Sequence, residues 1–164
     1  MRYGDGVERL KVYLESSVIS YLAARPSRDI VATAHQQVTR EWWEKSRRRF
    51  DLFVSGVVLN EIRRGDAAAS ELRLQYVAAL PVLEADDQAR LLAAQILKTS
   101  ALPEKAAADA AHIAIATVNG IDFLLTWNCT HIANGFVQRA ISRLSRETGF
   151  EPPTIVTPEE LTEP

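Results

Sequence analysis

Short apolar runs alternate along the chain with longer stretches in which apolar residues recur every three or four positions. The short runs are typical of buried β-strands and the longer stretches of amphipathic helices. The strand-like runs cover residues 10–14, 51–56, 81–85, 122–127 and 154–161. The helical patterns cover residues 16–24, 29–50, 57–66, 68–80, 86–102, 104–120 and 133–149. The last two helical patterns end at Gly120 and Gly149, residues that favour helix termination.

The order of these patterns predicts the fold class. Strands that alternate with helices predict a mainly parallel sheet with helices on both faces. The strand-like runs are almost continuously apolar, as in parallel strands buried on both faces. No linker, repeat or low-complexity segment interrupts the 164 residues. We therefore expect a single α/β domain over residues 1–164, with its core at about 11–161.

Composition and charge narrow the class of protein. With 47% hydrophobic residues the chain can form a core, and no apolar run approaches the roughly 18 residues that a membrane span needs. The net charge of −2 argues against a generally basic nucleic-acid binder. A single cysteine, Cys129, excludes an internal disulfide, and the N-terminal sequence lacks the pattern of a signal peptide. We therefore expect a cytoplasmic protein.

Four polar residues lie where a ligand site of such a sheet is expected. Ligands of open parallel sheets bind beyond the carboxyl ends of the strands. Glu15 follows the first strand-like run directly, Glu61 lies one or two turns into the helix after the second, and Asn128 follows the fourth. Asp109 lies in an alanine-rich helix, beside positions that look buried. Carboxylates without a thiolate or imidazole cluster suit hard cations such as Mg²⁺ or Mn²⁺.

Each of these residues also has a purely structural interpretation. Asp109 could be a first-turn carboxylate favoured by the helix dipole. Glu61 could pair with a nearby arginine, and Asn128 could cap a turn. Glu15 could be a solvated residue at the end of its strand. His112, one turn after Asp109, is more typical of a packed histidine than of a ligand, although neutral imidazole binds metals readily. The metal-site hypothesis rests on the set of residues and not on any single one.

Two further features leave alternatives open. The basic clusters around Lys45 and at Arg63–Arg64 are typical of solvated helix faces, but they could also contact a nucleic-acid backbone. Trp42 and Trp43 could form a protein interface, or one could pack in the core while the other covers it. Cys129 and His131 fit neither a nucleophile with a remote base nor a zinc site.

The segments VYLESSVISYL, FVSGVVLNEIRRG, AADAAHIAIATVNGIDFLLTWNCTHIAN and TIVTPEEL occur in this order over roughly residues 11–161. Together they resemble the PIN domain, the PilT N-terminus nuclease family that includes VapC-type toxins. The resemblance implies a three-layer α/β/α sandwich with a parallel sheet of four or five strands. It also implies hydrolysis of RNA with Mg²⁺ or Mn²⁺, a small antitoxin partner and a homodimer.

Residue by residue, the resemblance implies which side chains form the site. Glu15, Glu61 and Asp109 match the first three family acids, which hold the metal. Asn128 matches the fourth, usually an aspartate in the nucleases. Two positions depart from the family pattern, because Glu15 is one methylene longer than the usual aspartate and Asn128 is a neutral amide. Both departures bear on the strength of the activity.

The resemblance also implies supporting roles and two hypotheses for the function. Ser17 and Thr126 match hydroxyl residues of the family motifs. The first hypothesis is a metal-dependent ribonuclease, in which the clustered acids raise each other's pKa and Lys45, Arg63 and Arg64 contact the RNA backbone. The second is a PIN-like domain with a degenerate site that binds RNA or a protein without cutting.

Overall fold

The computed structural model describes residues 8–162 and contains a five-stranded parallel sheet. Its strands are β1 (Lys11–Leu14), β2 (Asp51–Ser55), β3 (Val82–Leu83), β4 (Phe123–Leu125) and β5 (Thr154–Val156). They lie in the order β3-β2-β1-β4-β5, and every neighbouring pair is parallel. The predicted parallel sheet is therefore confirmed, while the expectations for residues 1–7 and 163–164 fall outside the described residues.

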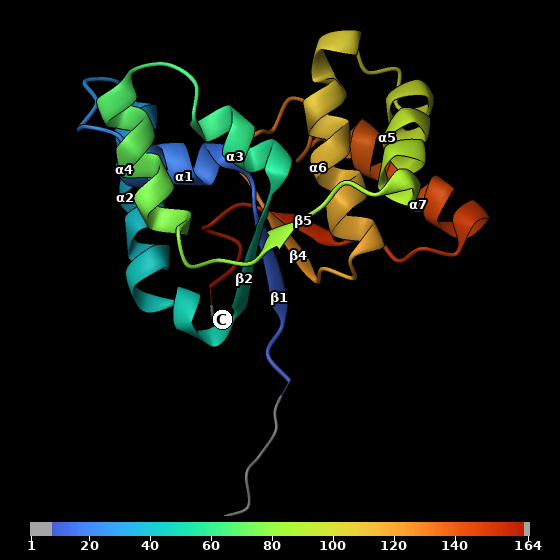
Figure 1. The fold of residues 1–164 in the computed structure, drawn as a ribbon, viewed down its shortest axis with the longest axis horizontal. Coiled ribbons are helices and arrows are strands. Elements are labelled where there is room, and N and C mark those ends of the chain that lie inside the picture. Colours follow the sequence, from blue (N-terminus) through green and yellow to red (C-terminus); the bar gives the residue numbers. More distant parts are fainter. Residues whose placement is uncertain (1–7, 163–164) are drawn as a thin grey trace, which may run out of the picture.

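Helices cover both faces of this sheet. They are α1 (Ser16–Ala23), α2 (Ile30–Lys45), α3 (Gly56–Ile62), α4 (Ala67–Val77), α5 (Asp87–Thr99), α6 (Ala107–Val118) and α7 (Gly135–Thr148). Two short 3₁₀ turns, η1 (Arg47–Arg49) and η2 (Glu104–Ala106), precede β2 and α6. Helices α1, α2 and α4 lie on one side of the sheet and α5, α6 and α7 on the other (Figure 1). The expected three-layer α/β/α sandwich is confirmed.

Local side-chain contacts explain where several helices begin and end. The carboxylates of Asp29, Asp66 and Asp86 each accept a backbone N–H of the first helical turn, at 2.8–2.9 Å. Such N-caps satisfy donors that have no partner within the helix. At the other end of α7, Gly149 adopts a left-handed conformation with φ of 79°, as its predicted role requires.

The core lies between strands β1 and β4 and the helices on either side of the sheet. Val12, Tyr13 and Leu14 of β1 are completely buried, as are Leu124 and Leu125 of β4. Burial on both faces explains why these strands are continuously apolar in sequence. No helix within residues 8–162 is long and apolar enough to cross a membrane.

The two neighbouring tryptophans have different environments. Trp42 is 2% exposed, and its indole N–H donates to the carbonyl oxygen of Leu161 at 2.9 Å. Trp43 is half-buried and packs against Tyr76, with the guanidinium of Arg47 lying 4.6 Å from its ring centre. The interpretation that one tryptophan enters the core while the other covers it is therefore confirmed.

Helix α5 offers a matched test of the packing. Leu92 is 5% exposed and its neighbour Leu91 is 69% exposed. We expect Leu92→Ala to lower the free energy of unfolding by about 3 kcal/mol, because it leaves a cavity in the core. Leu91→Ala is expected to change it by less than about 0.5 kcal/mol. Urea unfolding of the two variants measures the difference, and equal effects would contradict the orientation of α5.

Candidate active site

The carboxylate of Glu15 lies where β1 ends and α1 begins, and the residue is 4% exposed. Its Oε2 caps α1 by accepting the backbone N–H of Ser17 at 3.0 Å. The hydroxyls of Ser17 and Thr126 donate to the same oxygen, the second at 2.9 Å. Oε2 therefore has three donors, whereas Oε1 accepts only the hydroxyl of Ser16 among the described residues, at 3.1 Å.

Glu61 lies on α3, and a serine connects it to Glu15. The hydroxyl oxygen of Ser16 lies 3.1 Å from Oε1 of Glu15 and 3.2 Å from Oε1 of Glu61. The same oxygen of Glu61 accepts from Nε2 of His112 at 2.5 Å. Oε2 of Glu61 has no hydrogen-bond partner within residues 8–162. Each glutamate thus keeps one lightly engaged oxygen.

A buried chain of hydrogen bonds leads from the sheet to Glu61. Oγ of Ser55 lies 2.7 Å from the hydroxyl oxygen of Tyr13, which lies 2.6 Å from Nδ1 of His112. All three side chains are completely buried. Burial raises the pKa of Tyr13, so its hydroxyl keeps the proton and can donate it in a hydrogen bond.

The carboxylate of Glu61 determines which atom donates in each hydrogen bond of this chain. Nε2 of His112 faces an ionised carboxylate, so it carries a proton and donates. In the neutral imidazole, Nδ1 then accepts from Tyr13. Both ring nitrogens are therefore used within the protein, and His112 fixes the position of Glu61. This contact agrees with the prediction that His112 is a packed histidine.

Asp109 lies in the first turn of α6, and its side chain is 17% exposed. The amide of Asn128 donates to Oδ1 at 3.0 Å, and Nδ1 of His131 donates to Oδ2 at 2.9 Å. The carbonyl oxygen of Asn128 in turn accepts the backbone N–H groups of Thr130 and His131. Asn128 therefore connects Asp109 to the loop after β4 and uses both ends of its amide.

The pKa values of the two acids shift in opposite directions. Burial raises the pKa of Asp109, and the carboxylate of Glu15 adds to the rise, against the hydrogen bond from His131. Burial would also raise the pKa of Glu61, but the hydrogen bond from His112, helped by Ser16 and Arg64, outweighs it, so that this pKa is lowered. The expectation that clustered acids raise each other's pKa is therefore wrong for Glu61.

The donor set fits a hard divalent cation. Glu15, Glu61 and His112 each offer one ligand atom, and these atoms lie within 4.8 Å of one another. Because both nitrogens of His112 are hydrogen-bonded, the free donors of this group are carboxylate oxygens, which suit Mg²⁺ or Mn²⁺. Asp109 does not belong to this group of three, although Glu15 is close enough to affect its pKa.

The predicted basic residues lie in two different places. Arg63 and Arg64 follow Glu61 at the end of α3, both are exposed, and the charge of Arg64 contributes to lowering the pKa of Glu61. Lys45 is the last residue of α2 and is followed by η1 and the start of β2. It therefore lies at the opposite end of the sheet from Glu15 and Glu61, which follow the carboxyl ends of β1 and β2.

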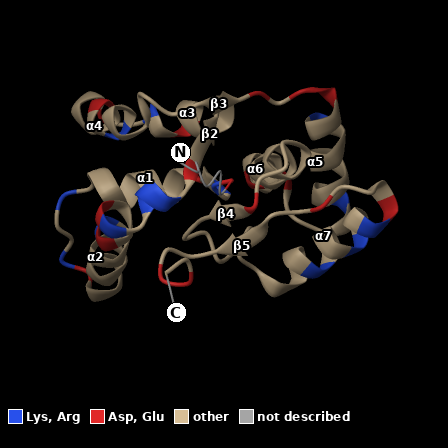
Figure 2. Cartoon of the chain, turned by 90° about the horizontal axis from the view of Figure 1, so that it is seen from below, with Lys and Arg blue, Asp and Glu red and all other residues tan. Residues whose placement is uncertain are grey.

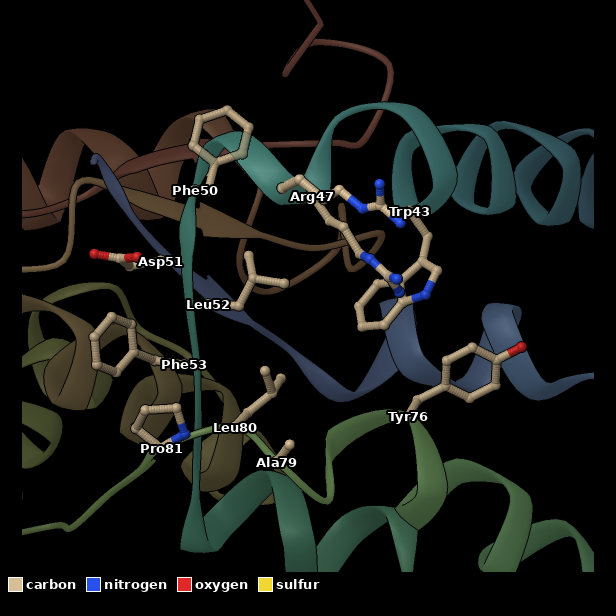
Figure 3. A pocket seen from close by; sticks show the side chains of 11 residues that line it. Trp43, Arg47, Phe50, Asp51, Leu52, Phe53, Tyr76, Ala79, Leu80 and Pro81 are labelled. Atoms are coloured by element: carbon tan, nitrogen blue, oxygen red, sulfur yellow. The ribbon is translucent and has the colours of Figure 1, made fainter. Parts of the chain in front are cut away.

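A hollow of about 610 Å³ also lies at that opposite end (Figure 3). Trp43, Tyr76 and Leu80 line it, together with the first residues of β2. None of the four predicted site residues contributes to its lining. The hollow is therefore separate from the acidic site.

Three residues of the site do not follow from sequence motifs. Tyr13 and Ser55 lie within strands whose sequences are almost continuously apolar. Only their hydroxyl groups indicate that a buried chain of hydrogen bonds could form there. The sequence relates His131 only to Cys129, which is exposed. Its contact with Asp109 depends on how the loop after β4 folds back toward α6, and no spacing rule predicts that path.

The hydrogen-bond chain predicts an effect at a distance. Tyr13→Phe removes the donor to Nδ1 of His112, which frees the imidazole to adopt the other tautomer. We expect Mn²⁺ affinity to fall by about tenfold, as for other changes behind metal ligands. Calorimetric titration of the metal-free protein measures it. Tyr76→Phe, on α4 beside Trp43, is the matched control. An equal loss of Mn²⁺ affinity in this variant would contradict the role of the hydrogen-bond chain.

The raised pKa of Asp109 predicts that ionisation of this carboxyl lowers the free energy of unfolding of the metal-free protein. The folded state binds this proton more tightly than the unfolded state, so ionisation lowers stability as the pH rises through the folded pKa. We expect Asp109→Asn to raise the free energy of unfolding by about 1 kcal/mol near pH 8 in chelator. Chemical unfolding from about pH 4 to 8 should show the gain shrinking toward acid, and a pH-independent difference would contradict this cause.

Comparison with known proteins places the chain among related folds. The family model of the PIN domain matches residues 12–128. No curated protein matches the sequence.

Three solved structures share the fold. VapBC2 from Rickettsia felis, solved bound to a promoter DNA fragment, has a TM-score of 0.58 at 11% identity, over 90% of this chain and 98% of that one. VapC20 from Mycobacterium tuberculosis, a sarcin-ricin loop cleaving toxin, has a TM-score of 0.59 at 18% identity, over 76% of this chain and 95% of that one. VapBC-1 from nontypeable Haemophilus influenzae has a TM-score of 0.56 at 14% identity, over 92% of this chain and 99% of that one. The match of the family model over most of the chain shows that it belongs to the PIN domain family.

Proposed function

We propose that this protein is a metal-dependent ribonuclease of the VapC toxin type that hydrolyses RNA phosphodiesters. The observation that carries the proposal is the pair of carboxylates, Glu15 and Glu61, bridged by Ser16 at the carboxyl edge of the sheet. In PIN domains this edge holds the acids. The likeness to VapC20, a sarcin-ricin loop cleaving toxin, supports RNA as the substrate class.

In this proposal Glu15, Glu61 and Asp109 hold one Mg²⁺ or Mn²⁺, directly or through water. A bound divalent ion would activate a water molecule and stabilise charge on the phosphate oxygens. Ser17 and Thr126 hold Oε2 of Glu15, which leaves Oε1 for the ion. His112 holds Glu61 in the same way from behind.

We assign Asn128 a positioning role. Its amide donates to Asp109, while its carbonyl oxygen accepts two backbone N–H groups. The oxygen is therefore less available to a metal than a free amide would be. This arrangement supports a site with a single ion held by three carboxylates.

We further propose a small antitoxin protein as a partner, by analogy with the VapBC2 and VapBC-1 structures. A homodimer is part of the same proposal, and size-exclusion chromatography at two concentrations tests it. Arg63 and Arg64 are the proposed RNA-backbone contacts near Glu61. Lys45, at the other end of the sheet, would contact only an RNA that extends beyond the site.

One observation favours a second candidate function. A neutral amide replaces the fourth acid, and Asp109 stands outside the group formed by Glu15, Glu61 and His112. A domain of this kind could bind RNA or a protein without cutting it. The two candidates differ in whether a folded protein with metal cleaves RNA.

A cleavage assay distinguishes them. A pool of structured and unstructured RNAs is incubated with Mn²⁺, with Mg²⁺ or with chelator. We expect cleavage that requires metal and that falls by at least about 100-fold in Asp109→Asn, because several kcal/mol of charge stabilisation are lost.

The control variant for this assay is Asp87→Asn, which removes a carboxylate whose side chain is 96% exposed on α5. It should cleave like the wild type. Cleavage that persists in Asp109→Asn would overturn the assignment of this residue. A folded wild-type protein that cleaves nothing with either metal would favour the non-cleaving module.

A further inference from the structure

Helix α7 carries a basic face that the proposed site does not use. Phe136, Arg139, Arg143 and Arg146 follow a spacing of three, four and three residues, which places them within an arc of about 80° on the helix surface. Val137, Ile141 and Leu144 form the buried face of the same helix. The orientation of α7 is therefore fixed by the core, and its arginines point to solvent. In Figure 2, blue segments recur along α7.

The basic face borders a hollow of about 600 Å³ that extends to Thr99 at the end of α5. No carboxylate lines this hollow. Arg143 forms an exposed ion pair with Glu147 at 3.4 Å. Within residues 8–162, neither Arg139 nor Arg146 contacts an acidic side chain. A chain with a net charge of −2 thus concentrates uncompensated positive charge on one helix.

Phe136 distinguishes this face from an ordinary solvated helix surface. It is 86% exposed, at the end of the face that is nearer in sequence to the active site. An aromatic ring beside arginines offers a stacking surface for a base together with partners for phosphates. Arginine also matches phosphate geometry better than lysine, because its planar fork presents paired donors.

The basic face is connected to the active site by a short segment. His131, which donates to Asp109, is five residues before Phe136, so their Cα atoms are at most roughly 18 Å apart. From Phe136 to Arg146 the face extends about 15 Å along the helix axis. A nucleic-acid strand held at the acids can therefore reach the face.

We propose that the basic face of α7 binds the sugar–phosphate backbone of the RNA substrate outside the cleavage site, with Phe136 stacking on a base. This inference rests on the proposed function, because it takes RNA as the ligand. It assigns the docking of structured RNA to a surface on the α5–α7 side of the sheet, in addition to the arginines near Glu61.

Binding is measured on the Asp109→Asn protein, so that no RNA is cut. A fluorescently labelled RNA hairpin with single-stranded flanks is titrated at several salt concentrations. The double variant Arg139→Gln with Arg146→Gln is expected to bind roughly tenfold more weakly. Its plot of log affinity against log salt should be shallower by about 1.4, since each lost phosphate contact on a single strand contributes about 0.7.

The matched control is Arg9→Gln with Arg28→Gln, which removes two exposed arginines that precede β1 and α2. It should leave the salt slope unchanged. Phe136→Ala should weaken binding by about tenfold with an unchanged slope, because stacking carries no charge. Thermal unfolding confirms that every variant is folded.

Equal losses in the α7 and control double variants would overturn the proposal, because they would reflect net charge alone. RNA binding that survives in the α7 variant, together with lost binding of a polyglutamate peptide, would assign the face to an acidic protein and also overturn it. A wild-type protein that cleaves no RNA would refute the proposed ribonuclease, yet the binding results would still decide the role of α7.

Discussion

The site depends on how Oε2 of Glu15 is held. This oxygen caps α1 and also accepts the hydroxyl of Thr126 from the segment after β4. One atom therefore joins the end of the first strand to the start of the first helix and to the neighbouring strand. The parallel pairing of β1 with β4 brings Glu15 and Thr126 to the same edge. A shift in that pairing would separate them and remove the Thr126 donor from a buried carboxylate, which is costly.

The second glutamate is positioned from the opposite direction. Glu61 receives its support from inside the core, through Ser55, Tyr13 and His112. Such a buried polar chain is favourable only when each donor meets an acceptor, and here each does. Ser55 also caps α3, the helix that carries Glu61. The same serine thus begins the helix and the hydrogen-bond chain that together fix this carboxylate.

Much of this arrangement could be predicted from the sequence. The apolar runs predicted the parallel sheet, and the rule that ligands bind at strand carboxyl ends pointed to Glu15, Glu61 and Asn128. Element boundaries were less accurate, since the 29–50 pattern ends as a helix at Lys45 and continues as a 3₁₀ turn. The contacts of Asp109 with Asn128 and His131 could not be predicted, because they depend on the path of a loop. The role of Tyr13 was also hidden, because a buried tyrosine reads as an apolar residue until its hydroxyl has partners.

The extra methylene of Glu15 has a physical rationale in these contacts. Its carboxylate must reach back to cap α1 and across to Thr126 with one oxygen, while the other oxygen meets Ser16 beside Glu61. The longer side chain gives the carboxylate the reach for these contacts, and its two oxygens divide them. Asn128 follows the same logic, since its amide donates to Asp109 where a carboxylate would repel it. The longer Glu15 thus gains reach, and Asn128 exchanges a negative charge for a hydrogen bond, so that both residues hold the carboxylates of the site in place with one negative charge fewer.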